Sequence, residues 1–185
     1  MVKEQRGMMF VLSSPSGTGK TTLTKKIAEL NSNSELRGVI LTGAGKTFCA
    51  GMDLHWMQKI SSQNRASRIA EATELSEMLN DLDRLNKPLM GKINGNSFGG
   101  AIGLISCCDF AVSAEDAEFS LTEVLLGLLP ATVSPFVIRR IGAANARRIM
   151  LNAHRFSAKE AVRFGLVAKA VSSQFLEEEI EKEII

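Results

Sequence analysis

Residue types that build metal sites and disulfide networks are scarce in this sequence. It has no tyrosine, one tryptophan (Trp56) and two histidines, His55 and His154, at unrelated positions. Its cysteines are Cys49, Cys107 and Cys108. Two separate histidines and an odd number of cysteines, two of them adjacent, fit neither a metal-ligand pattern nor a disulfide framework. We therefore expect no metal, free thiols and a reduced, cytoplasmic location.

Strong charge imbalance and long apolar runs are also absent. The 185 residues carry a formal net charge of +2, without a basic stripe of interleaved aromatic residues. No apolar run approaches a membrane span, and the N-terminus lacks the apolar core and cleavage site of a signal peptide. A hydrophobic share of 45% with 23% charged residues is typical of one globular domain with a sizeable core. Nucleic acid and membranes are thus not the expected partners.

The stretch from Asn94 to Asp109 organises the rest of the chain. Residues 89–93 are typical of a short strand, and Asn94-Gly95 is a turn signal. Gly99-Gly100 then opens an apolar helix that we expect to end near Cys107. A glycine pair at such a turn permits close approach of other backbone and leaves the first helical N–H groups unpaired. They could hold an oxyanion at the positive end of the helix dipole; a packed turn without chemistry is the alternative.

Two further stretches also carry recognisable motifs. A predicted strand at residues 39–42 leads into a segment that ends Phe48-Cys-Ala-Gly-Met-Asp-Leu54, and a third segment runs Phe119-Ser-Leu-Thr-Glu-Val-Leu-Leu-Gly-Leu-Leu-Pro130. In this order, the three motifs resemble those of the enoyl-CoA hydratase/isomerase family, the crotonases. The resemblance covers about residues 35–171.

The resemblance implies an α/β fold, a crotonase-like spiral of stacked ββα units. Residues 32–185 would form this domain, truncated at both ends. It would lack the family's N-terminal strands and most of the C-terminal helical region that covers the pocket. The family implies a homotrimer or a dimer of trimers, for which that C-terminal region is needed.

The resemblance also implies site residues. The backbone N–H groups of Met52 and Gly100 would form an oxyanion hole for the thioester of an acyl-CoA substrate, and Glu123 would transfer protons. Further substrate or CoA contacts would come from Ala50, Asp53, Leu54, Gly99, Ala101 and Pro130. Coenzyme A would be the carrier of the substrate, with no other cofactor. The second glutamate that many hydratases of the family use falls here on Gly103.

Glu123 is also notable without the resemblance. It directly precedes Val124, Leu125 and Leu126. A carboxylate among apolar side chains has its charged form desolvated, which raises its pKa and suits it to proton transfer. A surface glutamate or a helix cap is the alternative.

The N-terminal residues carry a different motif. A predicted strand at residues 8–12 is followed by Ser13-Ser-Pro-Ser-Gly-Thr-Gly-Lys-Thr-Thr22 and a predicted helix from about Leu23 to Leu30. This is the context of a phosphate-binding loop, in which Gly17, Gly19, Lys20 and Thr21 would contact phosphate. Residues 1–31 resemble the start of a guanylate kinase, but no monophosphate site or lid arginine cluster follows. Our hypothesis is a structural graft whose strand joins the sheet of the following domain.

The remaining pattern predicts mostly short elements. We expect an amphipathic helix over residues 64–86, strands at 109–113, 118–121 and 166–171, and helices at 136–141, 143–151, 158–164 and 175–185. Arg139 and Arg140 are expected to be solvated or to lie between subunits. Phe175, Leu176 and Ile180 are expected to be exposed.

Four functions stay open. Hydration of a 2-enoyl-CoA is the main expectation. Residues 121–124, 128–135 and 152–156 are most similar to the methylglutaconyl-CoA hydratases, which act in leucine or terpenoid breakdown. An enoyl-CoA isomerase would use Glu123 to shuttle a proton between carbons. The chain could also be an inactive or CoA-binding fragment from a gene fusion, or a P-loop nucleotide (GMP) kinase fragment.

Overall fold

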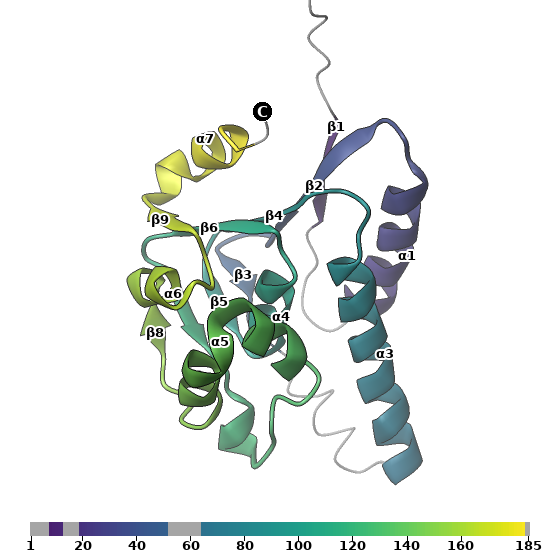
Figure 1. The fold of residues 1–185 in the computed structure, drawn as a ribbon, viewed down its shortest axis with the longest axis vertical. Helices are drawn as coiled ribbons and strands as arrows, with labels where there is room; N and C mark the ends of the chain where they lie inside the picture. Colours follow the sequence, from purple (N-terminus) through teal and green to yellow (C-terminus); the bar gives the residue numbers. More distant parts are fainter. Residues whose placement is uncertain (1–7, 13–18, 52–63, 184–185) are drawn as a thin grey trace, which may run out of the picture.

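Two β-sheets form the centre of the molecule (Figure 1). The computed structural model describes residues 8–12, 19–51 and 64–183. The first sheet consists, in spatial order, of β1 (Met8–Leu12), β2 (Leu36–Thr42), β4 (Leu89–Ile93), β6 (Phe110–Ala114) and β9 (Lys169–Val171), and all its strands are parallel. Its central strands are nearly continuous buried runs, as expected for a parallel sheet covered on both faces.

The second sheet is built from very short strands. They are, in spatial order, β3 (Thr47–Cys49), β5 (Asn96–Phe98), β7 (Glu118–Ser120) and β8 (Phe156–Ser157). Only the β7–β8 pair is antiparallel. The chain passes from the first sheet to the second three times, from β2 to β3, from β4 to β5 and from β6 to β7. This repeat is an α/β arrangement of stacked units, as the resemblance implied.

Asn94 links two successive turns between the sheets. Its Oδ1 accepts a hydrogen bond from the backbone N–H of Gly43 at 2.9 Å, and its Nδ2 donates to the carbonyl of Gly45 at 2.9 Å. The turn after β4 is therefore tied to the turn after β2. Such side-chain bonds satisfy loop backbone groups that neither sheet can pair.

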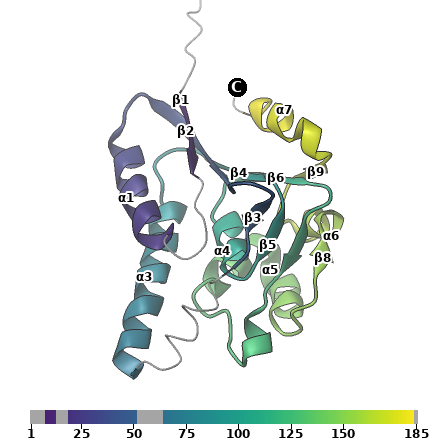
Figure 2. The same ribbon diagram turned by 180° about the vertical axis from the view of Figure 1, so that it is seen from behind.

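Helices surround the sheets. They are α1 (Gly19–Ser32), α3 (Arg65–Asp83), α4 (Gly100–Ser106), α5 (Ser134–Met150), α6 (Ala158–Phe164) and α7 (Leu176–Glu181), with the 3₁₀ segments η1 (Glu123–Leu126) and η2 (Ser173–Phe175). Figures 1 and 2 show α1 and α3 side by side at one edge, whereas α4 and α5 pack together beneath the sheets.

The helix boundaries follow local signals in the sequence. The Oδ1 of Asn64 accepts from the N–H of Ser67 at 2.9 Å and so caps the start of α3. The backbone of Gly142 has φ 75° and ψ 158°, which kinks α5 where the sequence predicted the end of one helix and the start of another. The side chain of Ser157 and that of Glu160 form a reciprocal capping box at α6.

The N-terminal strand lies where the graft hypothesis requires it. β1 is an edge strand that pairs in parallel with β2, and α1 forms the crossover between them. α1 begins at Gly19 and ends at Ser32, so it is longer at both ends than the predicted helix. Gly17 lies outside the described residues.

The sequence analysis missed three strands and wrongly expected two buried side chains to be exposed. Strands β3, β5 and β8 were not predicted, because they are too short to show alternation and do not lie in the longer stretches that predicted β7 and β9. Leu176 is only 5% exposed and Ile180 is fully buried, because α7 packs against β4 and β6; only Phe175 is exposed as predicted. Ion pairs from Lys92 to Glu177 and from Lys169 to Glu179 hold this helix in place.

Candidate active site

A sharp turn at Gly99 connects β5 to α4. Gly99 has φ 56° and ψ −125°, a conformation that residues with a side chain rarely adopt. Its N–H donates to the carbonyl of Ser120 at 2.8 Å, and its carbonyl accepts from the N–H of Ile102 at 3.0 Å. Gly100, the first residue of α4, is partly exposed. The turn therefore fixes the start of α4 to β7 and leaves that start accessible.

The carboxylate of Glu123 lies against this turn. A methyl group placed on Gly99 would be 3.5 Å from Oε1 of Glu123 and 3.6 Å from Oγ1 of Thr122. Glu123 is 7% exposed, and its Oε2 has no hydrogen-bond partner among the described residues. Burial raises the pKa of Glu123, although a hydrogen bond to its own backbone acts in the opposite direction.

This environment suits proton transfer. A buried polar atom without a partner lowers stability, so such atoms are rare in folded proteins. A raised pKa brings a carboxylate nearer to the range in which it can both accept and release a proton. A carboxylate of this kind beside an accessible helix start is therefore a functional-site candidate with a physical basis.

Gly51 brings the second predicted motif to the same place. The methyl group placed on Gly99 would lie 3.7 Å from the Cα of Gly51, and one placed on Gly51 would lie 3.2 Å from the carbonyl oxygen of Phe98. All three motifs thus meet, through Gly51, Gly99 and Glu123. The predicted residues Met52, Asp53 and Leu54 lie outside the described residues.

The other predicted contacts differ in accessibility. Ala50 is exposed. The side chain of Ala101 is fully buried, so only its backbone could reach a ligand. Pro130 is buried, and its carbonyl accepts hydrogen bonds from the N–H and the hydroxyl of Ser134 at 3.0 and 2.7 Å. Of the predicted phosphate loop, Gly19, Lys20 and Thr21 belong to the first turn of α1.

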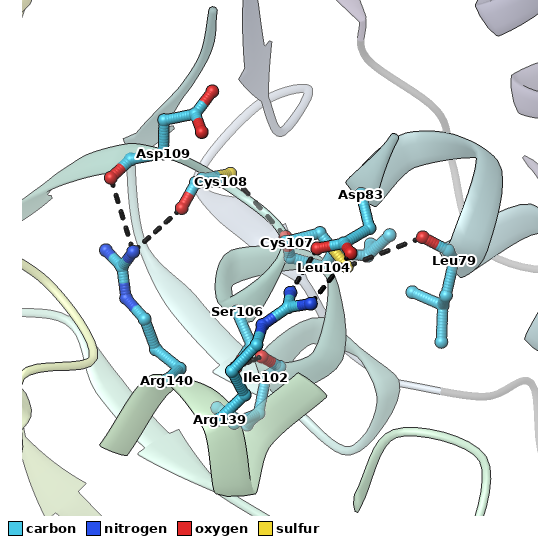
Figure 3. Close-up of polar contacts among 10 residues, drawn as sticks. All are labelled: Leu79, Asp83, Ile102, Leu104, Ser106, Cys107, Cys108, Asp109, Arg139 and Arg140. Atoms are coloured by element: carbon cyan, nitrogen blue, oxygen red, sulfur yellow. Dashed lines mark hydrogen bonds and ion pairs between the residues drawn. The ribbon is translucent and has the colours of Figure 1, made fainter. Parts of the chain in front are cut away.

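The C-terminal end of α4 is held by a residue that the sequence did not single out (Figure 3). Nη1 of Arg140 donates to the carbonyls of Cys108 and Asp109 at 2.8 and 3.3 Å, and its Nε donates to the carbonyl of Gly165 at 3.1 Å. Arg140 therefore binds backbone just after α4 and at the end of α6. It is half-buried, whereas the sequence analysis expected it to be solvated or to lie between subunits. Nothing in its local sequence indicates these distant carbonyls.

Neither a metal centre nor a membrane span is found in the described part of the chain. Among residues 8–12, 19–51 and 64–183, no three histidine, cysteine, aspartate or glutamate side chains are grouped as metal ligands. No helix in these ranges is both long and apolar enough to cross a membrane.

Comparison with known proteins decides the family. The family model for enoyl-CoA hydratase/isomerase matches residues 17–184, most of the chain. The chain belongs to the enoyl-CoA hydratase/isomerase family. The match begins close to the start of α1, so it includes part of the segment that also resembles a phosphate-binding loop.

Relatives of this crotonase are similar in sequence and in fold. It is 35% identical to enoyl-CoA hydratase AKT6-1 of Alternaria alternata, over 83% of this chain and 52% of that protein. It is 34% identical to the peroxisomal Delta(3,5)-Delta(2,4)-dienoyl-CoA isomerase of Arabidopsis thaliana, over 81% of this chain and 58% of that protein. The crystal structure of an enoyl-CoA hydratase from Shewanella pealeana matches with a TM-score of 0.87 and 32% identity. The match covers 94% of this chain and 68% of that one. The chain spans about half the length of the curated relatives it matches.

Proposed function

We propose that this crotonase acts on an acyl-CoA and hydrates the double bond of a 2-enoyl-CoA. The observation that carries the proposal is the buried carboxylate of Glu123, whose Oε2 is unpaired among the described residues and whose Oε1 lies against the Gly99 turn. A proton-transferring group is thereby held beside the start of a helix, where N–H groups favour negative charge.

In the proposed mechanism, the backbone N–H groups of Met52 and Gly100 bind the thioester oxygen. Glu123 accepts a proton from water while the hydroxide adds to the β-carbon, and the displaced electron pair moves to that oxygen as an enolate. The contact between Gly51 and Gly99, each of which directly precedes one proposed donor, supports this pairing. Removing one such donor typically lowers the rate about 100- to 1,000-fold.

For the substrate, we propose a CoA thioester, with a branched, methylglutaconyl-like acyl group as the first choice. The sequence motifs at residues 121–124 and 128–135, on either side of Glu123 and after it, support this choice because they resemble those of methylglutaconyl-CoA hydratases. The route would then be leucine or related fatty acid breakdown. A cytoplasmic location, which the cysteine pattern suggests, and a homotrimer or dimer of trimers, which the family suggests, are further parts of the proposal.

Isomerisation of an enoyl-CoA is the second candidate. The relative from Arabidopsis thaliana is an isomerase by name, and Gly103 offers no second acid on α4. A single carboxylate that removes a proton from one carbon and returns it to another would suffice for this reaction.

For residues 1–31, we propose a structural role as a separate sequence unit that completes the sheet of the domain formed by residues 32–185. The parallel pairing of β1 with β2 and the packing of α1 on α3 support this role. If the loop instead binds the CoA phosphates, Lys20→Ala will weaken CoA affinity. Unchanged CoA affinity of Lys20→Ala is the expected result. In a separate assay, absence of GMP phosphorylation by the parent would exclude the kinase alternative.

The decisive experiment follows the loss of enoyl-thioester absorbance with a short 2-enoyl-CoA and with 3-methylglutaconyl-CoA. We expect turnover by the parent and at least an approximately 100-fold lower kcat/KM for Glu123→Gln, since acid–base groups typically contribute about 100- to 10,000-fold. Glu118→Gln is the matched control, because Glu118 is partly exposed and pairs with Arg155 at 2.8 Å.

Absence of turnover in the folded parent would contradict the enzymatic proposal. Stabilisation of the parent by CoA or acyl-CoA in a thermal melt would then indicate a binding protein, because a ligand that binds only the folded state raises its stability. No stabilisation would indicate an inactive fragment.

A further inference from the structure

Gly103 and Val133 are packed so closely that position 103 has no room for a side chain. A methyl group placed on Gly103 would lie 2.5 Å from Cγ1 of Val133 and 2.8 Å from its Cβ. Real Cβ atoms essentially never lie within 3.0 Å of a heavy atom of another residue. Rotation of the Val133 side chain would move Cγ1 but not Cβ, so it would not remove the conflict.

Gly103 follows Gly99 by four residues, one turn farther along α4. A side chain on Gly99 would face the carboxylate of Glu123, whereas one on Gly103 would face Val133. The groups bordering these two glycines are therefore a carboxylate at the start of the helix and a buried valine one turn later, 2% exposed.

The backbone of Val133 is held in position. Val133 is the residue before α5, and its carbonyl accepts from the N–H of Val137 at 3.1 Å. The next residue, Ser134, makes two hydrogen bonds to the carbonyl of Pro130. The turn of residues 130–134 is thus closed by its own bonds, so Val133 can move away from α4 only together with the whole turn.

We propose that Val133 is a specificity-determining residue that closes the position from which a second acid–base side chain on α4 would reach the substrate, so that Glu123 carries the proton in both directions. This inference rests on the proposed acyl-CoA function. It adds that a single side chain, Glu123, carries the proton in that reaction. It explains in physical terms why position 103 is glycine: the space belongs to Val133.

The proposed step balances with one carboxylate. Water supplies a hydroxide to the β-carbon and a proton to Glu123, and the electron pair of the double bond moves to the thioester oxygen. The enolate then collapses and takes the same proton from Glu123 at the α-carbon. One water molecule is added, Glu123 returns to its ionised form, and no further reactant is needed.

The packing part is tested by a double-mutant cycle of Gly103→Ala and Val133→Gly in thermal unfolding. Alone, Gly103→Ala should lower Tm by about 2–12 °C, as overpacking does in a chain of this size. In the Val133→Gly background it should be neutral or stabilising, because alanine is the better helix former. An equal loss of Tm in both backgrounds, or none in either, would overturn the proposal.

The chemical part is tested by moving the carboxylate. In a Glu123→Gln, Val133→Gly background, Gly103→Glu should turn over 2-enoyl-CoA about 10-fold faster than Gly103→Gln, which has the same size and no charge. Acid–base groups contribute about 100- to 10,000-fold, and imperfect placement of the new carboxylate is expected to cost about 100-fold, so about 10-fold is the middle of the remaining range. Equal rates, in variants whose circular dichroism shows them folded, would overturn the proposal.

The proposed function is tested by a separate experiment. Turnover in the parent that is lost in Glu123→Gln is its own test, made without any change at Gly103 or Val133. If the parent has no turnover, the function and the catalytic role of Val133 fall together, whereas the double-mutant cycle still measures the packing.

Discussion

The carboxylate of Glu123 faces the backbone of Gly99, just beyond the ends of two neighbouring strands of the second sheet. Oε1 of Glu123 is 3.5 Å from the point where a methyl group on Gly99 would lie, and the N–H of Gly99 donates to the carbonyl of Ser120 at 2.8 Å. The strand that leads to Glu123 thereby also fixes the turn that starts α4. Base and helix start are positioned by the same piece of backbone.

Gly99→Ala should lower both stability and turnover. A side chain at φ 56° is strained, which typically costs about 1–3 kcal/mol, and relief of that strain would displace the start of α4 from Glu123. Urea unfolding measures the first effect and kcat/KM with a 2-enoyl-CoA measures the second.

Gly45→Ala is the matched control, because Gly45 has φ 73° and nothing within 4 Å of an added methyl group. It should lose a similar free energy of unfolding yet keep the turnover of the parent per folded molecule. Equal loss of turnover in both variants would contradict a specific role of the Gly99 turn.

The raised pKa of Glu123 predicts a pH-dependent gain of stability in Glu123→Gln. Because burial raises this pKa above its ordinary value of 4.5, the folded protein binds the proton more tightly than the unfolded chain does. The parent therefore loses stability as the pH rises from about 4.5 through the raised value. Glutamine has no charge to desolvate, so the variant should be more stable above that range, by about 1 kcal/mol or more.

The measurement is the difference in free energy of unfolding between parent and Glu123→Gln in urea, at several pH values from 4 to 9. The difference should shrink towards acidic pH and reach a plateau towards basic pH. A difference that grows on acidification would mean that the pKa is lowered in the folded state.

Two adjacent arginines should differ sharply in their contribution to stability. Arg140→Met removes hydrogen bonds from a charged group to the carbonyls of Cys108 and Gly165, and should cost about 1.5–3 kcal/mol. Arg139→Met removes an ion pair with Asp83 in which Arg139 is 59% exposed, and should cost about 0–1 kcal/mol. Urea unfolding compares the two variants, and equal losses would contradict the role of Arg140 drawn from Figure 3.

Thiol labelling should distinguish Cys49 from the adjacent pair. Burial, with Asp83 nearby, raises the pKa of Cys107 to about 12, and burial also raises the pKa of Cys108. Since the thiolate is the reactive form, only Cys49, which is half-buried, should react with a thiol reagent at pH 8 in the native protein. Mass spectrometry should find all three labelled in urea, and Cys49→Ser should abolish most native labelling. Rapid native labelling of that variant would contradict the burial of the pair.

Elements with strong local signals could be predicted from the sequence. The strand at residues 89–93 and the helix opened by Gly99-Gly100 are confirmed as β4 and α4, and the amphipathic helix after Asn64 is confirmed as α3. The family and the meeting of its three motifs followed from motif order. In each case the information lies within a few neighbouring residues.

Of the strands of two or three residues, β7 and β9 were predicted as parts of longer stretches, whereas β3, β5 and β8 could not be predicted in this way. β3 and β8 exist because a neighbouring strand pairs with them, and Phe156 in β8 stacks on Phe119 in β7 with ring centres 5.5 Å apart. Leu176 and Ile180 were expected at the surface, since a short charged helix does not show which sheet it will cover.

By itself, the sequence determined the family, the order of elements and the identity of Glu123 as the candidate base, because these depend on residue type and short spacing. Only the tertiary structure decided that the Glu123 carboxylate is buried against Gly99 and that Val133 fills the space beside Gly103. Those relations join residues 24 and 30 positions apart in the chain. Burial and close packing are properties of the folded arrangement, so no local pattern specifies them.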